Sequence, residues 1–498
     1  MIVWTPELAL AAALVLPLIG AALIALADKS PNRRELVTLV TSVLLFADIV
    51  YLFGEVAAGA RPQLDLLQVI PPLSLNFEIE PLGMLFAAVA SGLWIVNSVY
   101  SIGYMRGNNE QNQTRFYICF CIAIASAMAI AFAANMFTLF FFYETLTLST
   151  YPLVTHKGTD AARQGGRTYL GILLTTSIGF LLIGMVWTWV ITGTLDFTPG
   201  GILAGKADPA YVPVLLGLYM FGAGKAALMP FHRWLPAAMV APTPVSALLH
   251  AVAVVKAGVF TVLKVVVYIF GIDFLAETGG ATWLMWLAAA TIVLSSMVAL
   301  TKDNLKARLA YSTVSQLSYV TLGAALATSM GIIGGGVHIV MHAVGKITLF
   351  MCAGAIYVAT HKTEISDMNG LGRVMPFTYA AFLLGSLSII GLPPMGGAWS
   401  KFILMTAAAD TGQLIMIFVL MVSSLLNVAY LLPVVVNGFF APAPAAALSS
   451  AATFAPDGGI REAPLWCVVP PMLTGIGCVV LFFTAEPLMR FLEPIVRP

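Results

Sequence analysis

The stretch MFGAGKAALMPFHRWLPAAMVAPTPVSALL, residues 220–249, decides the fold, because it is apolar enough to enter a bilayer yet cannot form one unbroken helix. Each proline in it removes a backbone donor and clashes with an earlier carbonyl. Lys225 lies just before the first of four prolines, which are Pro230, Pro236, Pro242 and Pro244. A helix break at membrane depth is tolerated only where the freed backbone groups are buried in protein or line a wet cavity. The stretch therefore predicts an interrupted span beside a polar site.

The composition indicates an integral membrane protein. Of the 498 residues, 60% are hydrophobic and only 9% are Asp, Glu, Lys or Arg, whereas about 25% of a soluble domain is charged. The net charge of +1 disfavours nucleic-acid binding, and no basic run resembles a polybasic anchor. The N-terminus lacks the charged region and the small-residue cleavage site of a secretory signal, so we expect the first apolar segment to be a retained span.

Hydropathy along the chain predicts an all-α polytopic membrane protein of about 14 transmembrane helices. A bilayer core of about 30 Å needs about 20 apolar residues per helix. The runs are long and continuous, unlike the alternating ten-residue segments of a membrane barrel. The predicted spans are 7–27, 36–58, 81–105, 115–134, 135–155, 168–192, 211–240, 243–270, 282–301, 308–327, 331–360, 376–410, 412–438 and 465–490.

The loop charges predict the orientation. Cytoplasmic loops carry an excess of lysine and arginine, and here one set of alternate loops holds fifteen such residues while the other set holds four. The basic set, which we expect to be cytoplasmic, comprises Lys29, Arg33, Arg34, Arg106, Arg115, Lys157, Arg163, Arg167, Arg233, Lys302, Lys306, Arg308, Lys362, Arg373 and Arg461. The count places both termini outside.

A second interrupted span suggests an internal repeat. The stretch GLPPMGGAWSKF, residues 391–402, carries Pro393 and Pro394, and Lys401 follows them. Breaks in corresponding places point to inverted repeats around a midplane ion path. Here the broken helices are the seventh and the twelfth, and the two predicted repeats are helices 4–8 and helices 9–13. The alternative is that the prolines only kink these helices for packing. Two breaks five helices apart, each beside a lysine, disfavour that alternative. The predicted divisions are 1–110 (three helices), 111–275 and 276–440 (the repeats), 441–464 (a cytoplasmic linker) and 465–498 (the last helix).

Ionisable groups at membrane depth mark the candidate site. Each costs about 2.5 to 3.5 kcal/mol near a helix centre on insertion scales, which makes a functional site the default hypothesis. The carboxylates at this depth are Asp48 and Glu144, and the lysines are Lys225, Lys256, Lys264, Lys346 and Lys401. For Asp48, in the peripheral second helix, we expect no transport role.

One predicted helix aligns three such groups. His338, His342 and Lys346 are spaced i, i+4, i+8 and share one helical face. A lone membrane histidine is more often a packing residue, but three titratable groups in line favour a relay. His250 and Lys264 stand towards the two ends of the helix that carries Lys256, where Lys264 could snorkel outward. We therefore keep His250 and Lys264 as secondary candidates.

Redox and nucleotide chemistry are not expected in this chain. The five cysteines lie in apolar helices without a C-x-x-C pair, so we predict no metal or cluster ligation. GAGKAAL, residues 222–228, lacks the full phosphate-loop pattern. We predict no cofactor, no metal and no catalytic centre, so the chain would count as part of an enzyme only within a larger NADH-quinone oxidoreductase.

Five stretches resemble a known family: FYETLTLSTYPLV, the segment from Lys225 to Phe260, HAVGKITLFMCAGAI, MNGLGRVMP and GLPPMGGAWSKF. They are similar to the antiporter-like membrane subunits of Mrp-type cation/proton antiporters, respiratory complex I and membrane-bound hydrogenases, with the nearest likeness to the D subunits of Mrp-type antiporters. The resemblance implies a fourteen-helix fold with inverted five-helix repeats. It also implies that Glu144, Lys225, Lys256, Lys346 and Lys401 occupy the family's functional positions.

The residues suggest a mechanism. Burial destabilises an isolated ammonium, and a nearby carboxylate restores it by about 4 kcal/mol at 4 Å and an effective dielectric of 20. We hypothesise that Glu144 and Lys225 form such a pair, and that water carries protons on to a row ending at the outer exit. The row comprises Lys256, His338, His342, Lys346 and Lys401.

Three functions stay open at this point. The first is the proton-translocating subunit of a multisubunit monovalent cation (Na⁺)/proton antiporter. The second is a proton-pumping membrane-arm subunit of a complex I-like NADH-quinone oxidoreductase, hydrogenase or formate complex. The third is a stand-alone solute transporter or a structural subunit. The lack of a helix-core arginine disfavours the solute transporter. The first two predict other membrane subunits as partners in a prokaryotic inner membrane. Sodium sites favour oxygen ligands, of which this chain offers few, so we expect protons to be the ion that it carries. Whether another part of the assembly carries sodium is undecided.

Overall fold

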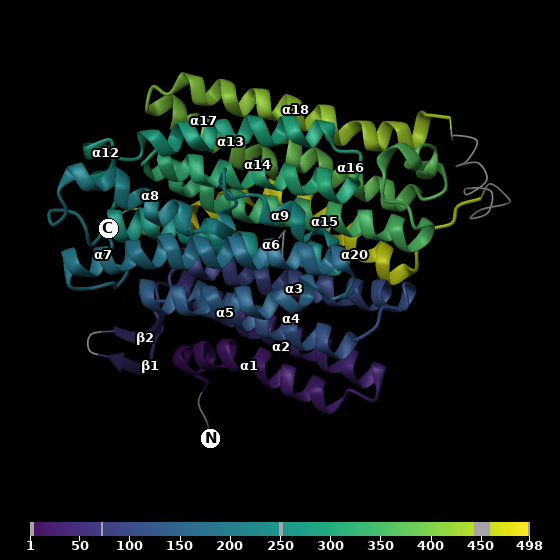
Figure 1. Ribbon diagram of the computed structural model, residues 1–498, viewed down its shortest axis with the longest axis horizontal. Helices are drawn as coiled ribbons and strands as arrows, with labels where there is room; N and C mark the ends of the chain where they lie inside the picture. The colour runs from purple at the N-terminus through teal and green to yellow at the C-terminus, as the bar shows by residue number, and fades with distance from the viewer. Residues whose placement is uncertain (1–3, 71–72, 249–251, 443–458, 497–498) are drawn as a thin grey trace.

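The computed structural model describes residues 4–70, 73–248, 252–442 and 459–496, and this part of the chain is mostly helical. The long helices run side by side, and the two-stranded hairpin lies at the left end of the bundle (Figure 1). The regular helices are α1 (Pro6–Leu26), α2 (Pro31–Ala57), α3 (Pro81–Gly107), α4 (Gln113–Ala131), α5 (Met136–Val154), α6 (Asp160–Thr176), α7 (Leu182–Thr192), α8 (Val212–Gly222), α9 (Trp234–Ala237), α10 (Thr243–Leu248), α11 (Val254–Lys264), α12 (Ile272–Thr278), α13 (Thr282–Thr301), α14 (Leu305–Ala325), α15 (Ser329–Thr360), α16 (Pro376–Ile390), α17 (Gly397–Asp410), α18 (Leu414–Phe440), α20 (Leu465–Phe483) and α21 (Ala485–Leu492).

The spans agree with an all-α membrane protein. In the described residues, nine helices are long and apolar enough to cross a membrane, and a tenth is obtained if Val254–Phe270 and Ile272–Thr278, which meet at 79°, count as one span. α6 continues into α7 through a π-helical turn at Ser177–Leu181. The number fourteen stays a prediction, because interrupted segments such as 376–410 consist of shorter helices.

A β-hairpin is the element that the sequence analysis did not predict. β1 (Gln63–Ile70) pairs antiparallel with β2 (Leu73–Glu78), with Gln63 opposite Glu78. In β2, apolar and polar residues alternate, which is the pattern of a half-buried strand. Phe77 accordingly points into the core.

The first predicted break is present. α8 ends at Gly222, one 3-10 turn covers Gly224–Ala226, and regular helix does not resume until α9 and α10. The indole Nε1 of Trp234 donates a 2.9 Å hydrogen bond to the carbonyl oxygen of Gly224 and so satisfies one backbone acceptor freed by the break. Pro230 and Pro236 lie within the irregular and short helical segments that follow.

The second predicted break separates α16 from α17. Gly391 ends α16 with φ at +89°, a conformation that L side chains rarely adopt. A Cβ built there would lie 2.7 Å from Cδ of Lys401, so any other residue would displace the lysine stem. Pro393 and Pro394 fall between the two helices. The predicted discontinuous seventh and twelfth helices are thus both interrupted where the prolines indicated.

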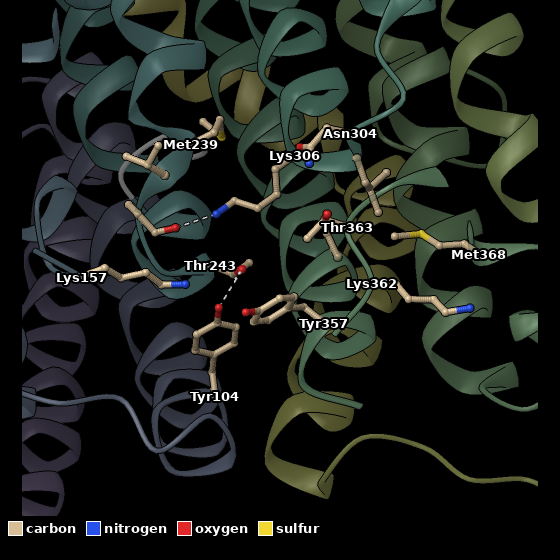
Figure 2. Close-up of a pocket in the computed structure, with 14 residues that line it drawn as sticks. Tyr104, Lys157, Met239, Thr243, Asn304, Lys306, Tyr357, Lys362, Thr363 and Met368 are labelled. Carbon is tan, nitrogen blue, oxygen red and sulfur yellow. Dashed lines mark hydrogen bonds between the residues drawn. The ribbon is translucent and has the colours of Figure 1, made fainter. Parts of the chain in front are cut away.

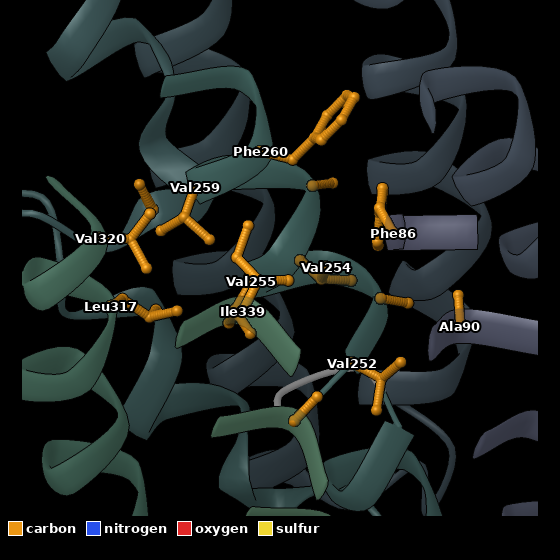
Figure 3. Packing of buried hydrophobic residues seen from close by; sticks show 14 of the residues in the cluster. Phe86, Ala90, Val252, Val254, Val255, Val259, Phe260, Leu317, Val320 and Ile339 are labelled. Carbon is orange, nitrogen blue, oxygen red and sulfur yellow. The ribbon is translucent and has the colours of Figure 1, made fainter. Parts of the chain in front are cut away.

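α11 and α15 form the centre of the bundle. α15 packs against α3, α14, α16, α17 and α20, and nearly every residue from Gly331 to Ile356 is buried. Figure 3 shows Val255 and Val259 of α11 packed against Ile339 of α15 and Val320 of α14. The outer helices α1 and α18, in contrast, expose leucine, valine and phenylalanine side chains. Polar groups on α11 and α15 are therefore enclosed by protein.

Candidate functional site

Lys225 stands at the first break and is fully buried. Its Nζ donates hydrogen bonds of 2.7 Å to the carbonyl oxygen of Tyr143 and 2.6 Å to Oγ1 of Thr147. The ammonium also lies 3.1 Å from the centroid of the Tyr143 ring, a cation–π contact. Because its backbone N–H donates to the Tyr143 hydroxyl at 2.9 Å, the lysine is fixed to α5 at both ends.

Glu144 is the neighbour of that anchor on α5. Both of its carboxylate oxygens are buried, and within the described part of the chain neither accepts a hydrogen bond. The described ion pairs within 4.0 Å do not include Glu144 with Lys225. In this conformation the hypothesised pair is therefore open, with the lysine on Thr147, one turn along from Glu144. Its role in transport stays a prediction.

Lys256 and His342 join α11 to α15. Nζ of Lys256 is in direct contact with Nδ1 of His342. Gly258 lets α11 approach the first break closely, because a Cβ there would overlap the backbone of Lys225 and Ala226. The segment that carries Lys256 therefore lies against the one that carries Lys225.

The two histidines of α15 continue the row. Their rings stack with centroids 5.8 Å apart, and His338 also stacks on Tyr319 at 5.3 Å. Nδ1 of His338 lies 2.9 Å from Oγ of Ser400 on α17. The common face predicted for His338 and His342 is thus present, and it leads towards the second break.

Lys401 follows Ser400 in that direction. Its Nζ donates to the carbonyl oxygen of Ile390 at 2.8 Å and to Oγ of Ser424 at 2.9 Å. The ammonium lies 5.1 Å from the centroid of the Tyr319 ring, the same ring on which His338 stacks. Lys401 thus occupies the last acceptor that α16 leaves free at its break.

Lys346 is turned to α14. Its Nζ donates to Oγ of Ser312 at 2.6 Å and to the carbonyl oxygen of Leu309 at 3.3 Å. The Tyr430 hydroxyl donates to the same Ser312 oxygen at 2.8 Å and also contacts Oδ1 of Asn427. A buried chain of hydroxyl groups therefore connects α15, α14 and α18.

Sequence reasoning missed the hydroxyl partners, although α14 carried a signal. Seven polar residues lie on successive turns of that predicted span: Ser312, Thr313, Ser315, Gln316, Ser318, Tyr319 and Thr321. All seven are buried. Since buried polar groups need partners, such a run indicates a polar face turned to the lysines.

Lys264 does not snorkel outward. It is buried, and its Nζ forms an ion pair with Oε1 of Glu80 at 3.3 Å, a residue that the sequence analysis did not single out. Glu80 also caps α3, accepting 2.8 Å hydrogen bonds from the N–H groups of Leu82 and Gly83, while Tyr268 donates to its Oε2 at 3.1 Å. The pair borders a cavity of about 110 Å³.

Asp48 and His250 are the two remaining candidates. Asp48 is buried in α2, and its oxygens accept no hydrogen bond within the described residues. His250 lies outside the described residues, as does most of the linker 441–464. In the described part of the chain, no group of three or more His, Cys, Asp or Glu residues could hold a metal ion.

The comparisons with known proteins assign the family. Residues 133–427 match the family described as NADH:quinone oxidoreductase/Mrp antiporter, transmembrane. The chain belongs to this family. The matched range contains Glu144, Lys225, the row from Lys256 to Lys401 and both broken helices. The resemblance inferred from the motifs is thereby confirmed.

Relatives in this NADH:quinone oxidoreductase/Mrp antiporter family include components of both kinds of assembly. The chain is 32% identical over 425 residues to NADH-quinone oxidoreductase subunit N of Desulforudis audaxviator, covering 82% of each. It is 31% identical to the A/B component of the probable K⁺/H⁺ antiporter of Rhizobium meliloti (69% of this chain, 34% of the relative). It is 29% identical to the A component of the Na⁺/H⁺ antiporter of Alkalihalophilus pseudofirmus (86% of this chain, 56% of the relative). It therefore spans only about a third and about half of those two antiporter proteins.

Solved structures show the same fold. A chain of the Mrp complex from Dietzia sp. superposes with a TM-score of 0.85 at 21% identity, covering 99% of this chain and 97% of the other. A chain of the archaeal membrane-bound sulfane sulfur reductase superposes with a TM-score of 0.84 at 23% identity, covering 98% and 97%. The predicted all-α polytopic fold is confirmed, and the chain is a multi-pass membrane protein of this family.

Proposed function

We propose that this chain is the proton-translocating membrane subunit of a multisubunit monovalent cation/proton antiporter. The observation that carries the proposal is the enclosed row of basic groups in contact across three helices, Lys256 with His342, His342 with His338, and His338 with Ser400 beside Lys401. Lys256 and His342 are in direct contact and can exchange a proton, whereas the stacked rings of His342 and His338 share no hydrogen bond, so a bridging water carries the proton between them. Buried ionisable groups in membrane proteins mark ion pathways.

The two breaks give the row its ends. At the first, Lys225 exchanges between Thr147, which it contacts here, and Glu144, one turn away. Pairing with the carboxylate stabilises the charged lysine, and release to neutral acceptors favours handing its proton on. At the second, Lys401 rests on the free carbonyl of Ile390. Lys346, whose Nζ donates to Oγ of Ser312, belongs to the row and continues it along α15 from His342.

The proposed setting follows from charge and family. The loops rich in lysine and arginine face the cytoplasm of a prokaryotic cell, both termini lie outside, and other membrane subunits complete the assembly. Sodium, if transported, passes through another subunit, because this row offers nitrogen bases and few oxygen ligands.

The proton-pumping arm of a redox complex is the second candidate. The 32% identity to an NADH-quinone oxidoreductase subunit N over 82% of both chains favours it. The chemistry proposed for this chain is the same in both cases. The difference lies in the partners, which either exchange a cation or oxidise a donor such as NADH, formate or hydrogen.

Reconstitution of the intact assembly into proteoliposomes tests the function. An imposed pH gradient should be dissipated on adding sodium or potassium if the chain serves an antiporter, and proton uptake should instead require an electron donor if it serves a redox complex. Glu144→Ala and Lys225→Ala should each abolish either flux. Proton flux that survives both substitutions unchanged would contradict a proton-translocating role, and Lys206→Ala, on an exposed loop lysine, is the matched control.

A further inference from the structure

A second polar cavity lies outside the row of bases, at the end of the bundle where α3, α5 and α15 end and α14 begins. It measures about 190 Å³. A single water needs about 10 to 15 Å³ by this measure, so the cavity has room for a polyatomic ion and water. The polar side chains that line its centre are Tyr104, Lys157, Thr243, Asn304, Lys306 and Tyr357.

The charge of this cavity is one-sided. Among the fourteen described residues that line it, three are lysines, Lys157, Lys306 and Lys362, and none is an acid. Lys306 donates at 2.6 Å to the carbonyl oxygen of Ala241, and Lys362 donates at 2.7 Å to that of Asp367, which are neutral acceptors. Lys306 and Lys362 are half-buried and Lys157 is more exposed, and positive groups partly removed from water without a counter-charge favour an anion nearby.

One nearby carboxylate offsets only part of this charge. Oε1 of Glu110 lies 4.0 Å from Nζ of Lys157, at the limit of an ion pair. The ammonium of Lys157 also lies 5.6 Å from the centroid of the Tyr357 ring, which leaves it facing the cavity. An anion in the cavity would supply the missing charge.

The donors converge on one space. Figure 2 shows the amino groups of Lys157 and Lys306 and the hydroxyls of Tyr104 and Tyr357 pointing inward, whereas Lys362 points away. The Thr243 hydroxyl donates to the Tyr104 oxygen at 3.4 Å, so the phenolic proton of Tyr104 is left for another acceptor. Four groups, two of them charged, can thus donate to a single ligand.

We propose that this cavity binds a phosphate group. A phosphate group, free or esterified, is tetrahedral and can accept from donors that arrive from different directions, whereas the two oxygens of a carboxylate accept within one plane. The phosphate is either a free ion, with which ammonium groups form charge-assisted hydrogen bonds, or the headgroup of an anionic lipid, which basic pockets at the cytoplasmic side of membrane proteins bind. The proposal does not rest on proton transport by the row of bases.

Titration of the purified intact assembly tests the site with three probes: inorganic phosphate, short-chain phosphatidylglycerol and acetate, each followed by the apparent Tm and by calorimetry. Saturable binding of free phosphate supports a free ion, and binding of phosphatidylglycerol alone supports a headgroup. No saturable binding of either, or acetate binding as tightly as phosphate, overturns the proposal.

Variants locate the binding. Lys157→Gln and Lys306→Gln should each weaken phosphate binding about tenfold, because each removes a charge-assisted hydrogen bond. Tyr357→Phe removes one neutral donor and should weaken it about threefold, which keeps the test usable if a lysine variant does not fold. Lys206→Gln, a basic loop residue outside the cavity, should leave binding unchanged. Unchanged affinity in all three cavity variants overturns the proposal.

Discussion

Nζ of Lys225 donates a 2.6 Å hydrogen bond to Oγ1 of Thr147, one turn along α5 from Glu144. The lysine of the first break is therefore held on a neutral oxygen while the buried carboxylate stands beside it. This arrangement makes the threonine a competitor of the glutamate for the same ammonium. In the proposed mechanism, the balance between the two acceptors sets how readily the lysine releases its proton.

Removing the competitor should change the transport rate. Thr147→Val deletes the acceptor, so Lys225 should shift towards Glu144 and release its proton less readily. A net hydrogen bond is worth about 1 kcal/mol, which corresponds to about a fivefold slower proton flux. Thr147→Ser should restore the rate, and Thr145→Val on the same helix should leave it unchanged. Equal flux in Thr147→Val and wild type would show that the contact has no part in transport.

Lys256 and His342 should act as one unit. Because their nitrogens are in contact, Lys256→Met and His342→Gln should each reduce proton flux at least tenfold, and the double variant should be little worse than either single one. A double-mutant cycle on flux measures the coupling. His361→Gln, an exposed histidine at the end of α15, is the control. Additive losses would mean that the two groups work independently.

The ion pair of Lys264 with Glu80 should stabilise the fold. Lys264→Met leaves a buried carboxylate without its cation, and breaking a buried pair from one side costs about 3 kcal/mol or more. The double variant Glu80→Gln, Lys264→Met should recover part of the loss. The apparent Tm of the purified assembly measures both. A Lys264→Met protein as stable as wild type would show that the pair contributes nothing.

His156 should make stability fall in acid. It lies in the loop after α5, and burial together with the charge of Arg115 lowers its pKa from 6.5 to about 4. Between these values the unfolded chain binds the proton and the folded chain does not, so stability is full above pH 6.5 and is lost as the pH falls towards 4. At pH 5 the loss is about 2 kcal/mol.

The variant His156→Gln should flatten this pH dependence. The apparent Tm recorded from pH 7 to pH 5 should fall less in His156→Gln than in wild type, and His361→Gln should follow wild type. Identical slopes in all three proteins would assign the acid sensitivity to other groups.

Much of the fold could be predicted from the sequence because its causes are local. Proline chemistry fixed both breaks, at Pro230 and at Pro393 with Pro394, and the i, i+4, i+8 spacing placed His338 and His342 on one face of α15. The hairpin was missed although Leu73, Leu75 and Phe77 alternate with polar residues. A short strand is easily hidden beside strongly apolar spans.

The partners of the lysines could not be predicted, because they depend on packing between distant segments. Glu80 is distant from Lys264 in the sequence and directly precedes the predicted span 81–105. A carboxylate at that position is expected to cap the helix, so the sequence does not indicate its ion pair with Lys264. Ser312 and Tyr430 reach Lys346 from two other helices. Hydropathy predicts that such groups lie within the membrane, but only the tertiary fold shows which of them are in contact.

Proton flux through the Lys346→Met assembly tests the central claim most directly. Lys346 is fully buried, donates to Ser312, and shares α15 with both histidines. In proteoliposomes with an imposed pH gradient, Lys346→Met should lower the flux at least tenfold while assembly and apparent Tm stay close to wild type. Lys206→Met should match wild type. Full flux in a correctly assembled Lys346→Met protein would contradict a proton path through this row of buried bases.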